Sequence, residues 1–306
     1  MGDNMENNLK DKILQLKKKR GAKILAHYYQ RGEIQDIADA VGDSYYLSKV
    51  AKDCNEQVIV FCGVKFMAES AKILSPEKTV ILPAMDAGCP MADMAEAHEV
   101  EELKKKHPKA KVVCYINSSA EVKALSDVCC TSSNALNIIR NIDEEEIIFL
   151  PDKNLGEYIQ EQVPEKKFII WNGFCITHKK VRHKEIIQAK DIHKDMVIVT
   201  HPECEKEIRD ESDFIGSTGE IINFVNISSN KKFLIVTEEG VLHQIDSKDN
   251  KEFYMPGGSM MCVNMKKTRL EDVYNSLLNM KNEIELKEDI RIKASIALKN
   301  MHKLGG

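Results

Sequence analysis

The sequence offers little that would bring the chain to a membrane or to nucleic acid. Its longest apolar runs, such as Val58 to Cys62, fall far short of the roughly 20 residues that a membrane-spanning helix needs. Residues 1–12 are polar and acidic, without the apolar core of a secretory signal. Lys and Arg number 44 against 48 Asp and Glu, so the net charge is −4 and no general basic field attracts nucleic acid. We therefore expect a cytoplasmic protein that binds neither membranes nor nucleic acid.

A disulfide framework and a zinc clip are also missing. The nine cysteines are an odd number and form no C-x-x-C pair; they stand at positions 54, 62, 89, 114, 129, 130, 175, 204 and 262. A reducing compartment keeps such thiols reduced, and we expect most of them to be small buried hydrophobic groups. The remaining question is which cysteines, if any, are metal ligands.

What the chain does contain is a repeat of about 87 residues. Three predicted strands, 23–26, 111–114 and 197–200, run into His27, Tyr115 and His201. A hydroxyl residue that opens a further helix follows each of them by 17 positions, at Ser44, Ser132 and Thr218. Each copy continues with a second strand (58–61, 147–150, 233–236), a third strand (79–82, 168–171, 252–255) and then a cysteine, at Cys89, Cys175 and Cys262.

Strands that alternate with helices are typical of parallel α/β units. The repeat predicts three αβα sandwich domains related by pseudo-threefold symmetry around a central site, where the carboxyl ends of the strands meet. The expected units are 1–90, 91–177 and 178–265, with the helical residues 266–306 packing back on the first unit. Two alternatives remain: three units in a row without a shared site, or a chance match.

One cysteine per unit can meet the others only in the folded protein. Three thiolates are one short of the four that fully hold an iron–sulfur cluster. A 4Fe–4S cluster on Cys89, Cys175 and Cys262 would leave one iron open to act as a Lewis acid on a substrate oxygen. Such an iron–sulfur centre suits dehydration better than electron transfer.

The polar residues that recur with these cysteines favour a small anionic substrate. His27, His178 and His201 can bind phosphate or carboxylate, or move protons. Hydroxyls and helix N-terminal amides come from Ser44, Ser132, Ser217 and Thr218, neutral donors from Tyr29, Tyr115 and Asn117, and a candidate base from Glu203. Each residue taken alone is more often structural, as a core histidine or a helix cap. The segment 201–204, His-Pro-Glu-Cys, could also be half of a zinc site, although no second His/Cys pair accompanies it.

Nine segments together resemble the A-type quinolinate synthases of NAD biosynthesis, over about residues 9 to 285. They are Ala26-His27-Tyr28-Tyr29-Gln30, Gly42-Asp43-Ser44, Gly88-Cys89-Pro90-Met91-Ala92, Tyr115-Ile116-Asn117-Ser118, Thr131-Ser132-Ser133-Asn134-Ala135, Cys175-Ile176-Thr177-His178, His201-Pro202-Glu203-Cys204, Gly216-Ser217-Thr218-Gly219 and Cys262-Val263-Asn264-Met265-Lys266.

The resemblance implies three pseudo-symmetric αβα domains and one 4Fe–4S cluster. It implies condensation of iminoaspartate with dihydroxyacetone phosphate to quinolinate, with loss of phosphate and two waters, and an enzyme that supplies iminoaspartate. Cys89, Cys175 and Cys262 would be the cluster ligands. Tyr29, His201 and Glu203 would be catalytic, and His27, Ser44, Tyr115, Asn117, Ser132, His178, Ser217 and Thr218 would bind substrate.

The sequence departs from this family at two places. Some members carry a C-x-x-C-x-x-C run at the last ligand, whereas Cys262 stands alone, which excludes the disulfide switch that the extra cysteines permit. Tyr28 replaces an asparagine that is common in other members, and we expect this to be tolerated because Tyr29 is the functional tyrosine of the motif. An iron–sulfur electron carrier and a non-catalytic metabolite sensor remain as alternative functions.

Overall fold

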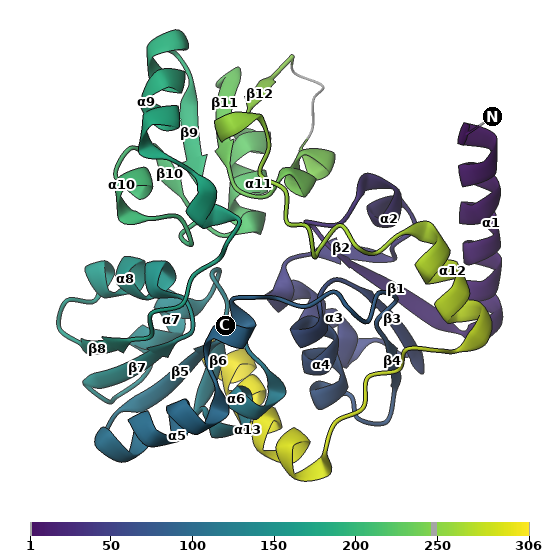
Figure 1. Cartoon of the computed structure of the whole chain (residues 1–306), viewed down its shortest axis with the longest axis horizontal. Helices are drawn as coiled ribbons and strands as arrows, with labels where there is room; N and C mark the ends of the chain where they lie inside the picture. The colour runs from purple at the N-terminus through teal and green to yellow at the C-terminus, as the bar shows by residue number, and fades with distance from the viewer. Residues whose placement is uncertain (1, 246–249, 306) are drawn as a thin grey trace.

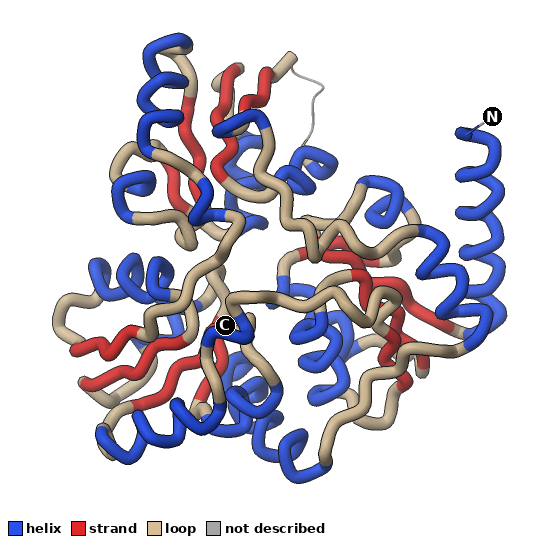
Figure 2. Tube along the Cα trace, viewed as in Figure 1, coloured by secondary structure: helices blue, strands red, loops and turns tan. Residues whose placement is uncertain are grey.

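The computed structural model describes residues 2–245 and 250–305. Three parallel four-stranded sheets, each covered by helices, surround a common centre (Figure 1; Figure 2). This arrangement confirms the predicted fold class of three αβα units. Among the residues described, no helix combines the length and the apolar character needed to cross a bilayer.

Each sheet has the same strand order, β2-β1-β3-β4 in the first unit, β6-β5-β7-β8 in the second and β10-β9-β11-β12 in the third. In each unit the strand that begins the repeat (β1, β5 or β9) therefore lies beside the second strand of the repeat (β3, β7 or β11). The polar carboxyl end of the first of these strands faces the centre. The strands are β1 (Ala22–His27), β2 (Ala40–Gly42), β3 (Val58–Cys62), β4 (Thr79–Ile81), β5 (Lys111–Tyr115), β6 (Val128–Cys130), β7 (Glu146–Leu150), β8 (Lys167–Ile170), β9 (Val197–Thr200), β10 (Phe214–Ile215), β11 (Lys232–Val236) and β12 (Glu252–Tyr254).

All nine strands predicted from the repeat are present, with bounds that agree within one residue. Their apolar runs form strands that are buried on both faces, as in β3, where all five residues are buried. The sequence did not reveal the edge strands β2, β6 and β10. They contain only two or three residues, which is too short for a hydrophobic period to be visible.

Helices cover both faces of the sheets. They are α1 (Gly2–Arg20), α2 (Gly32–Asp36), α3 (Ser44–Asp53), α4 (Lys65–Leu74), α5 (Ala97–Lys106), α6 (Ala120–Leu125), α7 (Ala135–Arg140), α8 (Lys153–Gln162), α9 (His183–Ile192), α10 (Lys206–Arg209), α11 (Thr218–Ile227), α12 (Leu270–Asn279) and α13 (Glu288–Leu304). The basic runs that close α1 and α5 lie where the helix dipole favours cations.

The repeat extends to side chains that stabilise each unit in the same way. One aspartate per unit accepts a hydrogen bond at 2.8 Å from the backbone N–H of the first strand; the pairs are Asp39 with Ile24, Asp127 with Val112, and Asp213 with Ile198. One lysine per unit also donates to two backbone carbonyls. These carbonyls lie at the C-terminal end of the helix that precedes the second strand, or just after that helix; the lysines are Lys78, Lys166 and Lys251. Equivalent internal bonds show that the three units share one construction.

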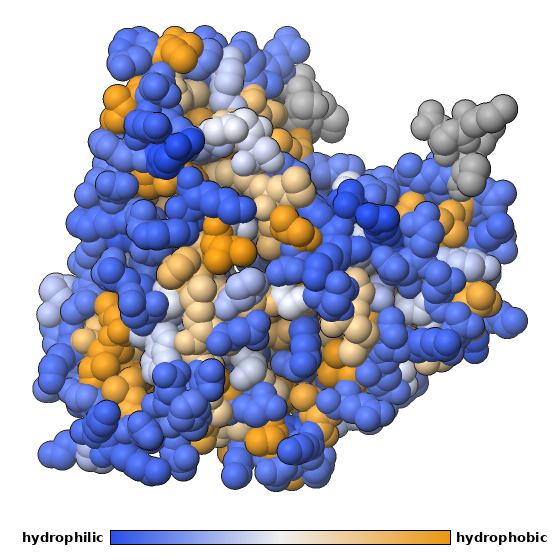
Figure 3. Space-filling view, in the orientation of Figure 1, coloured by the Kyte–Doolittle hydropathy of each residue, from blue (hydrophilic) through white to orange (hydrophobic). Residues whose placement is uncertain are grey.

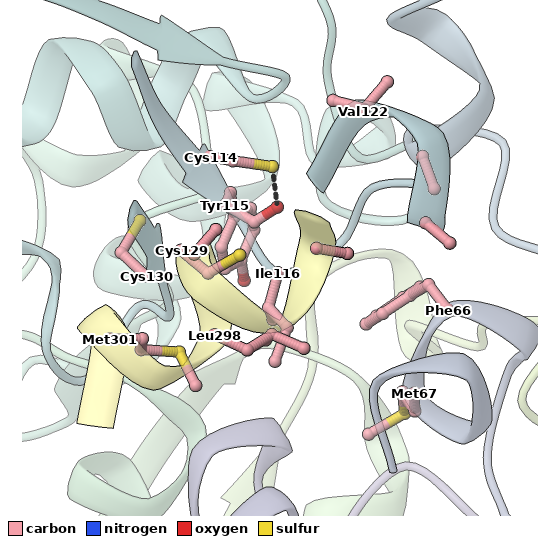
Figure 4. Close-up of a cluster of buried hydrophobic side chains, with 14 of the residues drawn as sticks. Phe66, Met67, Cys114, Tyr115, Ile116, Val122, Cys129, Cys130, Leu298 and Met301 are labelled. Carbon is pink, nitrogen blue, oxygen red and sulfur yellow. Dashed lines mark hydrogen bonds between the residues drawn. The ribbon is translucent and has the colours of Figure 1, made fainter. Parts of the chain in front are cut away.

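The C-terminal helices divide between two units, which corrects one expectation. Helix α12 packs on α1 and β3 of the first unit, whereas α13 lies chiefly against α6 and β6 of the second unit and also contacts α4. Figure 4 shows Leu298 and Met301 of α13 in the buried cluster that contains Ile116 and Cys129. The apolar face of α13 thus fills a gap between two units and joins them. We propose unit boundaries near residues 90, 177 and 265.

Candidate active site

One cavity lies where the three units meet, and every unit contributes to its wall. The predicted site residues that line it are His27, Tyr29, Ser44, Cys89, Tyr115, Asn117, Ser132, Cys175, His178, His201, Glu203, Thr218 and Cys262. Ser217 does not line the cavity. It caps α11 instead. The Ser217 hydroxyl accepts from the Glu220 backbone N–H, and the Glu220 carboxylate accepts from the Ser217 backbone N–H.

The carboxyl ends of the central strands supply the polar centre of this cavity. His27 ends β1, Tyr115 ends β5, and His201 directly follows β9. Because these strands occupy the same place in their sheets, their ends point toward the pseudo-threefold axis. The rings of His178 and His201 stack with centroids 4.9 Å apart.

Two of the three repeated hydroxyls occupy first helical positions rather than cap positions. Ser44 begins α3, and the preceding Asp43 is the cap, accepting from the Tyr46 backbone N–H at 2.8 Å. Thr218 likewise begins α11 after its cap. Because the preceding residue performs the capping, the Ser44 hydroxyl remains available to the cavity, and the Thr218 hydroxyl is free to contact the Tyr29 hydroxyl there.

The strand-end histidines have a defined orientation. Nδ1 of His27 accepts from the Tyr29 backbone N–H at 3.1 Å, and Nδ1 of His201 accepts from the Glu203 backbone N–H at 3.3 Å. The ring proton is therefore on Nε2, which in His201 lies 3.2 Å from the Ser132 hydroxyl. Burial lowers the pKa of both histidines to about 3 despite the nearby Glu203, so both are neutral donors at neutral pH.

Glu203 is a buried carboxylate whose two oxygens both have partners. Oε1 accepts from the Tyr115 hydroxyl at 2.7 Å, and Oε2 lies 2.8 Å from His178 Nδ1. Burial alone would raise the pKa of this carboxyl. His201, His178 and Tyr115 outweigh burial and hold the pKa well below its usual range, so Glu203 is ionised at neutral pH.

Thr237 connects this carboxylate to Tyr29 and was missed from the sequence. Its Oγ1 lies 3.2 Å from His178 Nε2 and 2.8 Å from the Tyr29 hydroxyl, which in turn lies 3.0 Å from the Thr218 hydroxyl. Thr237 directly follows β11, the second strand of its unit. Strand ends predict site residues, and applying that rule to second strands as well as first strands would have found it.

The three repeated cysteines differ from the other six. Cys89, Cys175 and Cys262 are partly exposed and line the cavity, whereas Cys62, Cys114, Cys129, Cys130 and Cys204 are buried. Cys54 is partly exposed but contacts Lys78 away from the cavity. Large exposed apolar side chains lie next to two of the three repeated cysteines, Ile176 beside Cys175, and Met261 and Val263 beside Cys262. Figure 3 shows apolar side chains gathered where the units meet, a surrounding that favours a water-poor site.

The local backbone around each of these cysteines suits an anionic sulfur. Burial raises the pKa of the Cys89 thiol to about 12 and also raises those of Cys175 and Cys262. Backbone N–H groups two and three residues later oppose this effect: Met91 and Ala92 at Cys89, Thr177 and His178 at Cys175, and Asn264 and Met265 at Cys262. The three loops thus offer matched donors to thiolates, which a bound metal centre would deprotonate. These residues fit an iron–sulfur cluster.

A second set of candidate ligand atoms overlaps with this one. Cys175 Sγ, a His178 nitrogen and a Glu203 oxygen lie within 4.8 Å of one another, which is close enough for a single ion. His178 and Glu203, however, already contact each other, and Glu203 also accepts from Tyr115. A cluster of four irons needs ligands that lie farther apart than a single ion does, so the two sets make different predictions about metal content.

The buried histidines make the stability of the metal-free protein depend on pH. His27 and His201 bind protons near their ordinary pKa of 6.5 when unfolded, but only near 3 when folded. Because the unfolded state binds more protons between these values, the free energy of unfolding should fall as pH drops below 6.5. Each histidine should contribute about 1.4 kcal/mol per pH unit.

Denaturant titration of the metal-free protein between pH 7 and 5.5 tests this prediction. His27→Gln should remove the contribution of that one histidine, about 1.4 kcal/mol per pH unit, while the same change at the exposed His98 serves as the control. An equal slope in His27→Gln and the parent would show that His27 is not held neutral.

Comparison with known proteins gives one consistent result. The family model for quinolinate synthetase A protein matches residues 11–303. A protein from Clostridium perfringens named quinolinate synthase is 70% identical over 300 residues, covering 98% of this chain and 100% of the relative. Proteins of the same name from Clostridioides difficile and Caldicellulosiruptor bescii are 56% and 53% identical, over 98% and 97% of this chain and 99% and 98% of theirs. The similarity covers all three units.

Proposed function

The chain belongs to the quinolinate synthetase A protein family, a family of enzymes in NAD biosynthesis, and we propose that it condenses iminoaspartate with dihydroxyacetone phosphate. The products are quinolinate, one phosphate and two waters, which balances the atoms of the two substrates. One observation carries the proposal. A cavity between three units combines three matched cysteine loops with neutral histidines, an ionised carboxylate and a protonated tyrosine. An enzyme that makes iminoaspartate, in the same cytoplasm, is the functional partner.

Cys89, Cys175 and Cys262 would hold a 4Fe–4S cluster in this enzyme. When bound, such a cluster supplies one iron without a protein ligand, which acts as a Lewis acid on a substrate oxygen. The matched backbone donors at the three sulfurs support this assignment.

Neutral donors bind the two anionic substrates. The Nε2–H groups of His27 and His201 and the hydroxyls of Ser44, Ser132 and Thr218 can all donate to phosphate or carboxylate oxygens. The N-termini of α3 and α11 add the positive ends of their helix dipoles. Lys180 also lines the cavity, and the neutral state of His27 and His201 leaves proton transfer to other groups.

Tyr29 and Glu203 are the acid and the base. Burial raises the pKa of the Tyr29 hydroxyl well above its ordinary value, so Tyr29 keeps its proton until a substrate oxygen takes it. Glu203 has the opposite perturbation and is ionised. The two shifts fix the starting protonation states that an acid and a base need, with Tyr29 protonated and Glu203 ionised.

A chain of close polar contacts joins the two groups. Glu203 Oε2 lies 2.8 Å from His178 Nδ1, and His178 Nε2 lies 3.2 Å from Thr237 Oγ1. Thr237 Oγ1 also lies 2.8 Å from the Tyr29 hydroxyl. After Tyr29 has given its proton to a substrate oxygen and Glu203 has taken one, a proton passed from Glu203 through His178 and Thr237 would restore Tyr29 without bulk water entering the cavity.

A turnover assay under strict anaerobiosis tests the proposed function. Freshly generated iminoaspartate and dihydroxyacetone phosphate should give quinolinate and phosphate in equal amounts, and omission of either substrate should give none. Brief exposure to air should remove the activity and the visible absorption together, because an open iron is accessible to oxidants. An electron carrier or a metabolite sensor would form no quinolinate under any of these conditions.

A further inference from the structure

The cysteine loops of all three units are fixed by the same backbone hydrogen bond. A residue at or near the start of the segment after the second strand donates its N–H to the carbonyl two residues before the cysteine. The pairs are Lys65 with Ala87, Lys153 with Gly173 and Glu239 with Met260, at 2.8, 2.8 and 3.0 Å. The residue just before each donor therefore lies beside the ligand loop of its own unit.

These neighbouring positions are occupied by Val64, Asp152 and Glu238, and they differ in chemistry. Glu238 Oε1 accepts from the backbone N–H of Cys262 at 2.9 Å. Burial raises the pKa of Asp152, and the backbone N–H of Cys175 is among the groups that lower it, without the close contact seen at Glu238. Val64 offers no acceptor to Cys89. The strongest link between a carboxylate and a ligand loop is thus in the third unit.

Glu238 is fully buried and shares its charge with Lys266. The lysine Nζ lies 3.0 Å from Oε1 and 3.1 Å from Oε2, and it also donates to the Tyr29 carbonyl at 2.7 Å. Lys266 itself is 8% exposed. The buried pair therefore connects the loop of Cys262 to the loop that carries Tyr29.

We propose that Glu238 is a positioning residue for the metal centre, which holds the Cys262 loop in its ligating conformation, and that Lys266 links this loop to Tyr29. The inference rests on the proposed function, because Cys262 is a ligand only if the cluster is present. Partners that orient metal ligands in this way typically change metal affinity about 10–100-fold when they are removed.

A carboxylate is needed at this position because both of its oxygens accept. Oε1 accepts from Cys262 N–H and Lys266, while Oε2 accepts from the Gly240 backbone N–H at 2.7 Å and from Lys266. A glutamine has one oxygen and one NH₂ group. Whichever way it is turned, its NH₂ would face a backbone N–H donor, so Glu238→Gln breaks one side of the link while keeping the shape of the side chain.

The test measures iron rather than activity. Anaerobically reconstituted parent and Glu238→Gln proteins are mixed with an iron chelator, and iron release is followed by absorbance. We expect Glu238→Gln to bind iron about 10–100-fold more weakly and to lose it correspondingly faster. Lys266→Met, which leaves Glu238 in place, should also release iron faster than the parent. If Glu238→Gln fails to fold, the rate of iron release from Lys266→Met tests the inference in its place.

Lys251→Met is the matched control. Lys251 is also 8% exposed and lies in the same unit, but it donates to the Val225 and Asn226 carbonyls away from the cavity. Its loss should lower thermal stability and leave the rate of iron release unchanged. Parent-like release from folded Glu238→Gln and Lys266→Met proteins would overturn the inference. A parent protein that takes up no iron would instead refute the proposed function, and the inference with it.

Discussion

Cys175→Ala is expected to form no measurable quinolinate and to lose the cluster. Cys175 lines the cavity beside His178 and Glu203, and its sulfur receives two backbone hydrogen bonds. Removing one of three protein ligands leaves two irons without protein attachment, so the loss should be complete rather than partial. Quinolinate formation and visible absorption, measured anaerobically on the same sample, should fall to background together. Cys89→Ala and Cys262→Ala should behave alike.

Cys54→Ala is the matched control for this prediction. Its thiol is also partly exposed, but it accepts from Lys78 outside the cavity. Cys54→Ala should keep both the absorption and the activity of the parent, and so should changes at the buried Cys129 and Cys130. An active Cys175→Ala protein with a full cluster would refute the ligand assignment.

Tyr29→Phe should lower the rate of turnover about 10²–10⁴-fold, the usual cost of losing a positioned acid or base. The change removes one hydroxyl and little volume. It also removes the contact between the Tyr29 hydroxyl and Thr237 Oγ1, so Tyr29 is no longer connected to His178 and Glu203. Iron content and substrate affinity should stay near those of the parent, since Tyr29 is neither a proposed ligand nor a main anion contact.

Tyr28→Phe provides the comparison, since Tyr28 is the neighbouring residue but does not line the cavity. It should turn over at nearly the parent rate. If Tyr29→Phe were equally fast, the proton-transfer role would be wrong. If Tyr29→Phe lost its iron, Tyr29 would instead be part of what holds the metal centre.

The repeat explains why so much of the fold could be predicted from sequence. Cys89, Cys175 and Cys262, and the strand-end residues His27 and His201, occupy matched places in three copies, and matched places converge when the copies pack symmetrically. The strands could be located because each is a continuous apolar run. A symmetric sequence therefore predicts a shared centre without any knowledge of side-chain contacts.

The features that the sequence did not reveal depend on tertiary packing. Helix α13 has an apolar face that the first two units could both accept, and only the assembled structure shows that it lies on α6 and β6. Ser217 reads as a site residue beside Thr218, yet its hydroxyl caps α11. Glu238 breaks the threefold pattern, because Val64 occupies its place in the first unit. Repeats predict what the copies share and miss what one copy adds.

Metal analysis of anaerobically purified protein tests the central claim most directly. The parent should contain about four irons and four acid-labile sulfides per chain, and Cys89→Ala, Cys175→Ala and Cys262→Ala should contain none. A single ion per chain, without sulfide, that is lost in Cys175→Ala but retained in Cys89→Ala and Cys262→Ala would contradict that claim. That result would assign the metal to Cys175, His178 and Glu203 instead.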